Sequence, residues 1–278
     1  MEERAPRALA LENVCGLASS HDGDDFRTVV QEFNRLGYSV DAFELNARRW
    51  LPQSRPRMFV VGLRDPIDGG EIDSPLRPDR LAWIHSDKRL VTHLSPLPPA
   101  PPLLSNGLQS VVENLPLGDS RWWDDERCAK FLQGLSDVQC ARFKKLVDGA
   151  PVVRTAYRRT RHGRPAWEIR SDDIAGCLRT ARGGSSRQAL IFMGSGTARM
   201  RWMTGLEYAR LQGASNFCLK GFTEAQIQYA FGDAVAVPAV HWLMDSVVLP
   251  SLRGEDDAGG EVIRYPGEAG ARNLLRVV

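Results

Sequence analysis

Apolar residues near the start of the chain first follow a strand pattern and then a helical one. Residues 8–14 (ALALENV) predict a short buried strand that ends in polar residues. Helical spacing follows at Phe26, Val29, Val30, Phe33 and Leu36. We expect Asp24 or Asp25 to cap this helix and Gly37 to end it.

Two further apolar runs predict strands. Residues 39–47 (SVDAFELNA) and 57–64 (RMFVVGLR) are rich in Val and Phe, and a turn-like segment, residues 48–56, joins them. The order is therefore strand, helix, strand, strand. It is typical of the back half of an α/β sheet, because a complete doubly wound fold begins with strand and phosphate-loop units of its own.

The pattern weakens between residues 65 and 200, where Pro and Gly are frequent. Residues 95–103 (SPLPPAPPL) predict an extended loop. Residues 129–149 predict a helix in two pieces, and residues 156–170 alternate well enough for a hairpin about His162 and Gly163. We interpret this region as a second, less regular domain.

Two helix starts after residue 200 have capping boxes. Thr204 with Glu207 and Thr223 with Gln226 each place a hydroxyl and a carboxyl or amide three residues apart. Pro238 fits the first turn of another helix. The tail beyond Arg253 is rich in Gly and acidic residues, so we expect it to be flexible.

Composition places the chain among soluble globular proteins. Of its 278 residues, 43% are hydrophobic and 25% charged, which is enough apolar material for one or two cores. No apolar run approaches the roughly 20 residues of a membrane span, and no secretory signal opens the chain. We therefore expect a cytoplasmic protein that does not bind membranes.

Neither metal binding nor disulfide bonding is indicated. The five cysteines are odd in number, scattered and never arranged as CxxC, so we expect buried thiols and no metal. The five histidines are equally dispersed, and we expect His241, within an apolar helix pattern, to be packed rather than a ligand.

Arginine is concentrated in one segment. The whole chain has a net charge of only +2, but residues 154–187 contain nine Arg against one Glu and two Asp, a balance of +6. This segment suits contact with phosphates and base edges. A solvated basic face is the alternative, and charge alone does not choose between them.

Four short motifs carry a family resemblance. They are Glu12-Asn13-Val14, Gln53-Ser54-Arg55-Pro56-Arg57, Glu207–Gly213 (EYARLQG) and Gly232–Pro238 (GDAVAVP). In this order they resemble the later signature motifs of the cytosine-5 DNA methyltransferase family, and the variable region lies where that family places its target-recognition domain.

The resemblance implies an α/β fold: the back half of a Rossmann-like S-adenosylmethionine-dependent methyltransferase sheet, plus a smaller, irregular target-recognition domain. Residues 1–64 would be the C-terminal part of the catalytic domain and residues 65–200 the recognition domain. Residues 201–252 would return the final motifs to the catalytic domain, and residues 253–278 would form the flexible tail.

The family's chemistry implies roles for three residues. A cysteine thiolate adds to C6 of a cytosine flipped out of duplex DNA, and C5 then attacks the methyl group of S-adenosylmethionine. Glu12 would contact N3 and N4 of the base, Arg57 would donate to O2, and Arg55 would support the loop around the nucleophile. Solvated arginines in a Pro-containing turn are the alternative.

Two further sets of residues follow from the resemblance. Asp233, Ala234 and Val235 would complete a cofactor pocket, although Asp233 stands where Asn is usual; an ordinary helix start is the alternative. In the segment Thr204–Gly213, Leu206 replaces the usual Arg, which argues against a DNA-backbone or structural contact there. The predicted DNA-binding residues at the end of the recognition domain are Arg179, Arg182, Gly183, Gly184, Ser185, Ser186, Arg187 and Gln188. A tight glycine turn between strands is the alternative there.

The family's glycine-rich cofactor loop and Pro-Cys nucleophile motif normally precede the ENV strand, but only seven residues stand before Ala8. We therefore expect one subunit of a split enzyme, with a second chain supplying those motifs and most of the cofactor site. The edge of the strand at residues 8–14 would be the docking surface. The alternatives are a non-catalytic DNA-binding remnant and a truncated or mis-started gene product.

Overall fold

Two units divide the chain in the computed structural model, which describes residues 6–161, 163–180, 187–253, 262–263 and 275–276. Unit 1 comprises Met1–Asn46, Pro56–Pro101 and Pro238–Val278, and unit 2 comprises Ala47–Arg55 and Pro102–Val237. Residues 65–101 thus belong with the first strands, and residues 201–237 with the Arg-rich segment. The assignment of catalytic and recognition domains stays a prediction.

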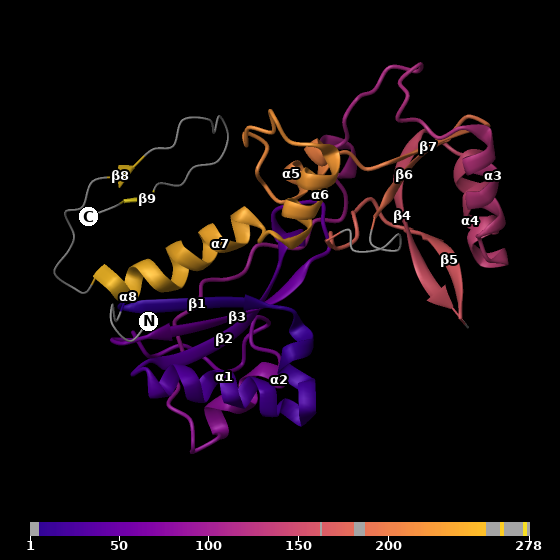
Figure 1. Cartoon of the computed structure of the whole chain (residues 1–278). Coiled ribbons are helices and arrows are strands. Elements are labelled where there is room, and N and C mark those ends of the chain that lie inside the picture. Colours follow the sequence, from indigo (N-terminus) through magenta and orange to yellow (C-terminus); the bar gives the residue numbers. More distant parts are fainter. Residues whose placement is uncertain (1–5, 162, 181–186, 254–261, 264–274, 277–278) are drawn as a thin grey trace. The chain divides into compact units, whose positions relative to one another are not determined.

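The sheet of unit 1 has the three predicted strands. They are β1 (Ala8–Asn13), β2 (Ser39–Asn46) and β3 (Pro56–Leu63), in the order β1-β3-β2 with both pairings antiparallel. Figure 1 shows α1 on one face of this sheet and α7 on the other. Among the described strands β1 pairs only with β3, so one of its edges has no strand partner.

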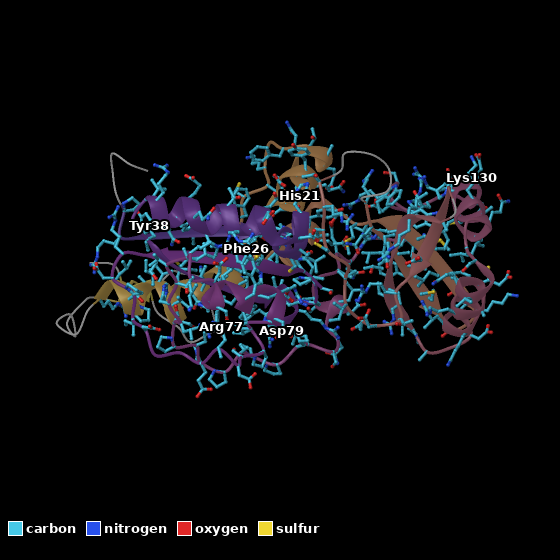
Figure 2. All side chains as sticks on the ribbon, turned by 90° about the horizontal axis from the view of Figure 1, so that it is seen from below. His21, Phe26, Tyr38, Arg77, Asp79 and Lys130 are labelled. Carbon is cyan, nitrogen blue, oxygen red and sulfur yellow. The ribbon has the colours of Figure 1, made fainter. Side chains whose placement is uncertain are left out.

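Helix α1 (Asp24–Arg35) follows a 3-10 segment, Cys15–Gly23. The predicted cap was wrong: the N-cap is Gly23 at φ 91°, and Asp24 and Asp25 lie in the first turn, where their charges still favour the helix N-terminus. Gly37, at φ 85°, ends the helix as predicted. Phe26, labelled in Figure 2, is fully buried in the core of unit 1.

Residues 65–101 add little regular structure to unit 1. A short helix α2 (Asp79–Ala82) runs into a 3-10 turn, Trp83–Ser86. A buried ion pair joins this segment to the sheet: Arg77 (Figure 2) donates to Asp41 of β2 at 2.6 Å and 3.1 Å. Both side chains are almost fully inaccessible to solvent, so the irregular segment is anchored by a paired charge rather than by apolar packing alone.

Unit 2 has a four-stranded antiparallel sheet in the order β5-β4-β6-β7. Its strands are β4 (Val152–Arg161), β5 (Arg164–Ile169), β6 (Ala189–Gly194) and β7 (Thr197–Trp202). Arg161 pairs with Arg164, which confirms the predicted hairpin, although His162 lies outside the described residues. Helices α3 (Asp125–Gln133) and α4 (Asp137–Val147) confirm the predicted helix in two pieces.

Both capping boxes are present in unit 2. They start helices α5 (Gly205–Leu211) and α6 (Glu224–Asp233). Glu207 has a second role in addition to its capping bonds, because it pairs with Arg201 at 2.5 Å and neither side chain is exposed. The guanidinium of Arg201 also lies 5.6 Å from the ring centroid of Trp122 and 5.2 Å from that of Phe192, so aromatic rings as well as a carboxylate surround this charge.

The last described helices belong to unit 1, except for their first residue, Val237, which belongs to unit 2. Helix α7 (Val237–Leu243) continues through a π-helix, Met244–Val248, into α8 (Leu249–Arg253), and the two-residue strands β8 (Val262–Ile263) and β9 (Leu275–Arg276) pair with each other. His241 is exposed, so the prediction that it is packed was wrong. Phe43 of β2 contacts Trp242 edge to face, which places α7 against the sheet.

One helical segment has the length and apolar composition that a membrane span requires, although the sequence pattern did not predict one. Glu224–Arg253 is long and apolar enough by length and composition alone, a test that core helices of soluble proteins also pass. The run is not one helix, because Ala234 is extended (φ −66°, ψ 158°) between α6 and α7. The longer uninterrupted part, Val237–Arg253, has 17 residues and spans about 25 Å, shorter than a typical hydrocarbon core.

Candidate functional site

Glu12 and Arg57 meet on the sheet of unit 1. Glu12 on β1 lies opposite Phe59 of β3, and Arg57 is two residues from Phe59, so both side chains project from the same face. Arg57 Nε lies 3.0 Å from Glu12 Oε1, and the side chains are 15% and 21% exposed. The two residues predicted to hold the base therefore form one ion pair that remains accessible to a ligand.

Cys15 lies three residues beyond Glu12 but is not an activated thiol. Burial raises its pKa to about 11, and a hydrogen bond and the charge of Glu44 act in the same direction, against the opposing effect of Arg80. The thiolate is the nucleophilic form of cysteine, so at neutral pH almost all of this residue is in the unreactive form. Cys15 is thus unsuited to attack a pyrimidine.

Arg55 joins three motifs inside unit 2. Its guanidinium is buried, with 3% of the residue exposed. Nη1 donates to the carbonyl of Leu178 at 3.0 Å and Nη2 to the carbonyl of Ala234 at 2.7 Å. The QSRPR loop is therefore tied both to the segment that precedes the predicted DNA-binding residues and to the GDAVAVP motif.

Two buried glutamines complete this network, and the sequence analysis missed both. Gln53 donates to the carbonyl of Leu211 at 2.6 Å and accepts from the amide of Leu178 at 3.0 Å. Gln212 donates to the carbonyls of Phe231 and Ala234 at 2.7 Å and 3.2 Å. Both lie inside quoted motifs, which was the available signal, and the structure shows the partners that buried amides need.

The predicted cofactor residues present suitable groups on a rigid backbone. Asp233 and Val235 are exposed, while the carbonyl of Ala234 between them is held by Arg55 and Gln212. A Cβ on Gly232 would lie 2.4 Å from the carbonyl oxygen of Arg179, so only glycine allows this approach. An exposed carboxylate therefore lies two residues from an exposed apolar side chain on this backbone.

The predicted DNA-binding residues have different environments. Residues 182–186 lie outside the described part of the chain. Arg179 is exposed, and the guanidinium of Arg187 stacks over Trp202 at 5.0 Å. Gln188 is buried and its amide bonds both the N–H and the carbonyl of Gly176, at 3.0 Å and 2.9 Å. A contact between this amide and DNA would require that link to open.

No group of three or more His, Cys, Asp and Glu side chains in the described residues could hold a metal ion.

A family model described as C-5 cytosine-specific DNA methylase matches residues 1–248. The type II methyltransferase M.BspRI of Lysinibacillus sphaericus is 42% identical over 64 residues, which are 23% of this chain and 15% of that protein. The type II methyltransferase M1.ScrFI of Lactococcus lactis subsp. cremoris is 23% identical over 252 residues, 89% of this chain and 53% of that protein. The chain thus spans about half the length of the second relative and far less of the first.

A solved structure shares the fold. The Entamoeba histolytica methyltransferase EhMeth aligns with a TM-score of 0.50 and 13% identity, covering 86% of this chain and 62% of that one. At this identity the likeness concerns the fold alone. The mixed helix and strand architecture of this chain is therefore one that a methyltransferase also has.

Proposed function

Because this chain belongs to the C-5 cytosine-specific DNA methylase family, we propose that it forms the C-terminal part of a DNA (cytosine-5-)-methyltransferase. The substrate would be duplex DNA, and the enzyme would act in the cytoplasm. The contact between Glu12 and Arg57 carries the proposal, since it brings together the two groups that the chemistry needs around one pyrimidine.

Glu12 and Arg57 would recognise and polarise the target base. A carboxyl group can accept from the exocyclic N4 amine of cytosine and exchange a proton with N3, while a guanidinium donates to O2. Held 3.0 Å apart, the two groups form a rigid surface complementary to one edge of cytosine. That edge is engaged in pairing within a duplex, so the base must leave the stack before it can bind.

The chain would also hold part of the cofactor site. S-adenosylmethionine supplies the methyl group when it is bound. Asp233 and Val235 would bind and orient it, and Ala234 would keep the backbone between them in place through its bond with Arg55. Arg55 acts on the reaction through this backbone and is therefore a positioning residue.

The nucleophilic thiol would lie outside these 278 residues. None of the five cysteines within these 278 residues follows a proline, and Cys15 is protonated at neutral pH. We propose that a second chain carries the Pro-Cys motif and the glycine-rich cofactor loop. The edge of β1 that has no partner among the described strands would receive a strand of that chain, because an unpaired edge offers a row of free N–H and C=O groups.

Reconstitution tests the proposal. The chain is mixed with a polypeptide that carries the two absent motifs, and transfer of a labelled methyl group from S-adenosylmethionine to duplex DNA is measured. We expect transfer by the mixture and a loss of roughly 10²–10⁴-fold with Glu12→Gln. Glu32→Gln is the control, because Glu32 is an exposed carboxylate paired with Arg35 on α1, and it should leave the rate unchanged.

A wild-type mixture that transfers no label overturns the two-chain enzyme. If the isolated chain nevertheless binds DNA in a salt-dependent way, a non-catalytic DNA-binding protein is favoured instead, and the Arg-rich segment at residues 154–187 is the observation that supports this second candidate. Equal rates for Glu12→Gln and Glu32→Gln would exclude a catalytic role for Glu12.

A further inference from the structure

Three tryptophans of unit 2 form one cluster beside α3. The rings of Trp123 and Trp202 lie 4.9 Å apart, those of Trp167 and Trp202 5.7 Å apart, and those of Trp123 and Trp167 6.0 Å apart. All three side chains are partly exposed. The cluster therefore combines a fixed aromatic surface with access to solvent.

Two arginines lie over these rings, and a third is the cross-strand neighbour of Trp167. The Cζ atom of Arg127, on α3, lies 5.6 Å from the ring centroid of Trp123 and 5.8 Å from that of Trp202. The Cζ atom of Arg187 lies 5.0 Å from the same Trp202 centroid. Arg158 on β4 stands directly opposite Trp167 on β5. We call these six residues the arginine–tryptophan patch.

Three other arginines of this region are neutralised by carboxylates: Arg154 pairs with Asp173, Arg159 with Glu168 and Arg170 with Asp172. Within the described part of the chain, no carboxylate pairs with the guanidinium of Arg127, Arg158 or Arg187.

This arrangement is typical of an anion site. The guanidiniums of Arg127 and Arg187 lie 5.8 Å and 5.0 Å from the centroid of one indole ring, so two positive charges are associated with a single aromatic side chain. Stacking on the rings also restricts the guanidiniums before any ligand arrives, which lowers the entropy lost on binding. The planar, weakly hydrated guanidinium matches the oxygens of a phosphate.

We propose that the arginine–tryptophan patch binds backbone phosphates of duplex DNA, with Arg127 and Arg158 as phosphate-contacting residues in addition to Arg187. The proposal rests on the function proposed above, because it takes DNA as the ligand. Contacts of this kind fix the position of the protein on the duplex and carry no sequence information directly.

The test uses the complete 278-residue chain and a short fluorescein-labelled DNA duplex. The dissociation constant is measured by fluorescence anisotropy over a range of salt concentrations for wild type, Arg127→Gln, Arg158→Gln and the double variant. Each lost phosphate contact should reduce the slope of log affinity against log salt by about 0.9, and the double variant by about 1.8. A second duplex of different sequence should show the same losses.

Lys130→Gln is the matched control. Lys130 lies on α3 with Arg127 and carries the same charge, but Glu126 neutralises it and its side chain is 70% exposed (Figure 2). The slope should not change. Circular dichroism checks that all variants fold, as expected for substitutions of surface side chains.

Each outcome bears on the proposal. If the wild type binds DNA and the arginine variants show the same salt slope, the patch does not bind phosphates. The proposed methyltransferase function would not be affected by that result. A loss confined to one duplex sequence would also overturn it, because it would indicate base contacts. Wild type that binds neither duplex rejects the patch as well, whereas failure of the enzyme itself appears separately as absent methyl transfer in the reconstituted mixture.

Discussion

Replacing Arg55 with methionine removes the donors that hold the carbonyls of Leu178 and Ala234. Methionine fills a similar volume but cannot donate, so the Ala234 carbonyl keeps only the longer bond from Gln212 and the Leu178 carbonyl only the Cys177 thiol. Hydrogen bonds from a charged donor contribute about 1.5–3 kcal/mol each. We expect the free energy of unfolding to fall by about 2–4 kcal/mol in urea titrations. Methyl transfer by the reconstituted enzyme should fall as well, because the GDAVAVP backbone loses its anchor.

Arg89→Met is the control for this substitution. The Arg89 side chain is 65% exposed and pairs with Asp87 at the surface, so its loss should change stability by no more than about 0.5 kcal/mol. If Arg55→Met and Arg89→Met were equally stable, Arg55 would not be the link between the motifs that the structure indicates.

At the residue scale, sequence reasoning identified the charged groups better than the buried amides. Glu12, Arg55 and Arg57 were singled out by the motifs, and the structure brings Glu12 and Arg57 together. Gln53 and Gln212 were missed because an amide in a motif gives no sign of whether it faces solvent or backbone. Only the folded chain shows the carbonyls to which they donate.

At the element scale, the segment of residues 65–101 is attached to β2 by a buried polar cluster. Asp41 accepts from both Arg77 and the amide of Ser95, and His85 Nε2 lies 3.4 Å away. Burial alone would raise the pKa of Asp41, but the hydrogen bonds from His85 and Arg77 outweigh it and lower the pKa to about 2. The carboxylate therefore stays charged throughout the physiological range.

His93 makes this attachment sensitive to mild acid. Burial lowers its pKa below the ordinary 6.5, against the opposing charges of Asp41 and Asp68. Above pH 6.5 the imidazole is neutral in both the folded and unfolded states. As the pH falls through 6.5 the unfolded chain binds a proton that the folded chain does not, so the free energy of unfolding should decrease. The free energy of unfolding falls further through Asp41 only at lower pH, between pH 3.8 and about pH 2.

Urea titrations at a series of pH values check this expectation. His93→Gln keeps a polar group facing Ser39 but cannot titrate, so stability should vary less between about pH 7 and pH 5 than in wild type. His241→Gln, at an exposed position, should keep the wild-type dependence. Identical profiles for all three proteins would show that His93 is not the sensitive group.

Element boundaries were predictable where the signal was local. The two capping boxes and the hairpin depend on residues two to five positions apart, and each was confirmed. The cap of α1 was assigned wrongly because Gly23, at φ 91°, ends the preceding 3-10 segment and takes the N-cap position itself. The capping preferences of Asp side chains therefore could not show that Gly23 adopts the N-cap position, because its backbone angle depends on the preceding segment.

At the scale of the whole molecule, the open edge of β1 predicts a stability that depends on a partner. A second chain that binds only the folded state should raise the free energy of unfolding, by about 2.7 kcal/mol when its concentration is one hundred times its dissociation constant. Thermal melts with and without the complementary polypeptide measure this effect. We expect the melting temperature to rise with partner concentration, and a melting temperature that does not move would contradict docking.

An unrelated protein of similar size and charge is the control for that measurement. Crowding alone favours the folded state by only about 0.2–1 kcal/mol, so a specific partner is distinguished by the size of the shift and its saturation. The shift should also persist with Glu12→Gln, because that substitution removes catalytic chemistry and leaves the backbone of the β1 edge intact.

By itself the sequence determined the first three strands, the β4–β5 hairpin, the two helix starts with capping boxes and the order of the family motifs, because these depend on spacing along the chain. The tertiary structure alone decided that residues 65–101 pack with the first strands, that Arg55 joins motifs more than 100 positions apart, and that Arg127 and Arg187 lie over one tryptophan ring. Such contacts depend on strand order and register, which bring distant residues together and which no local pattern specifies.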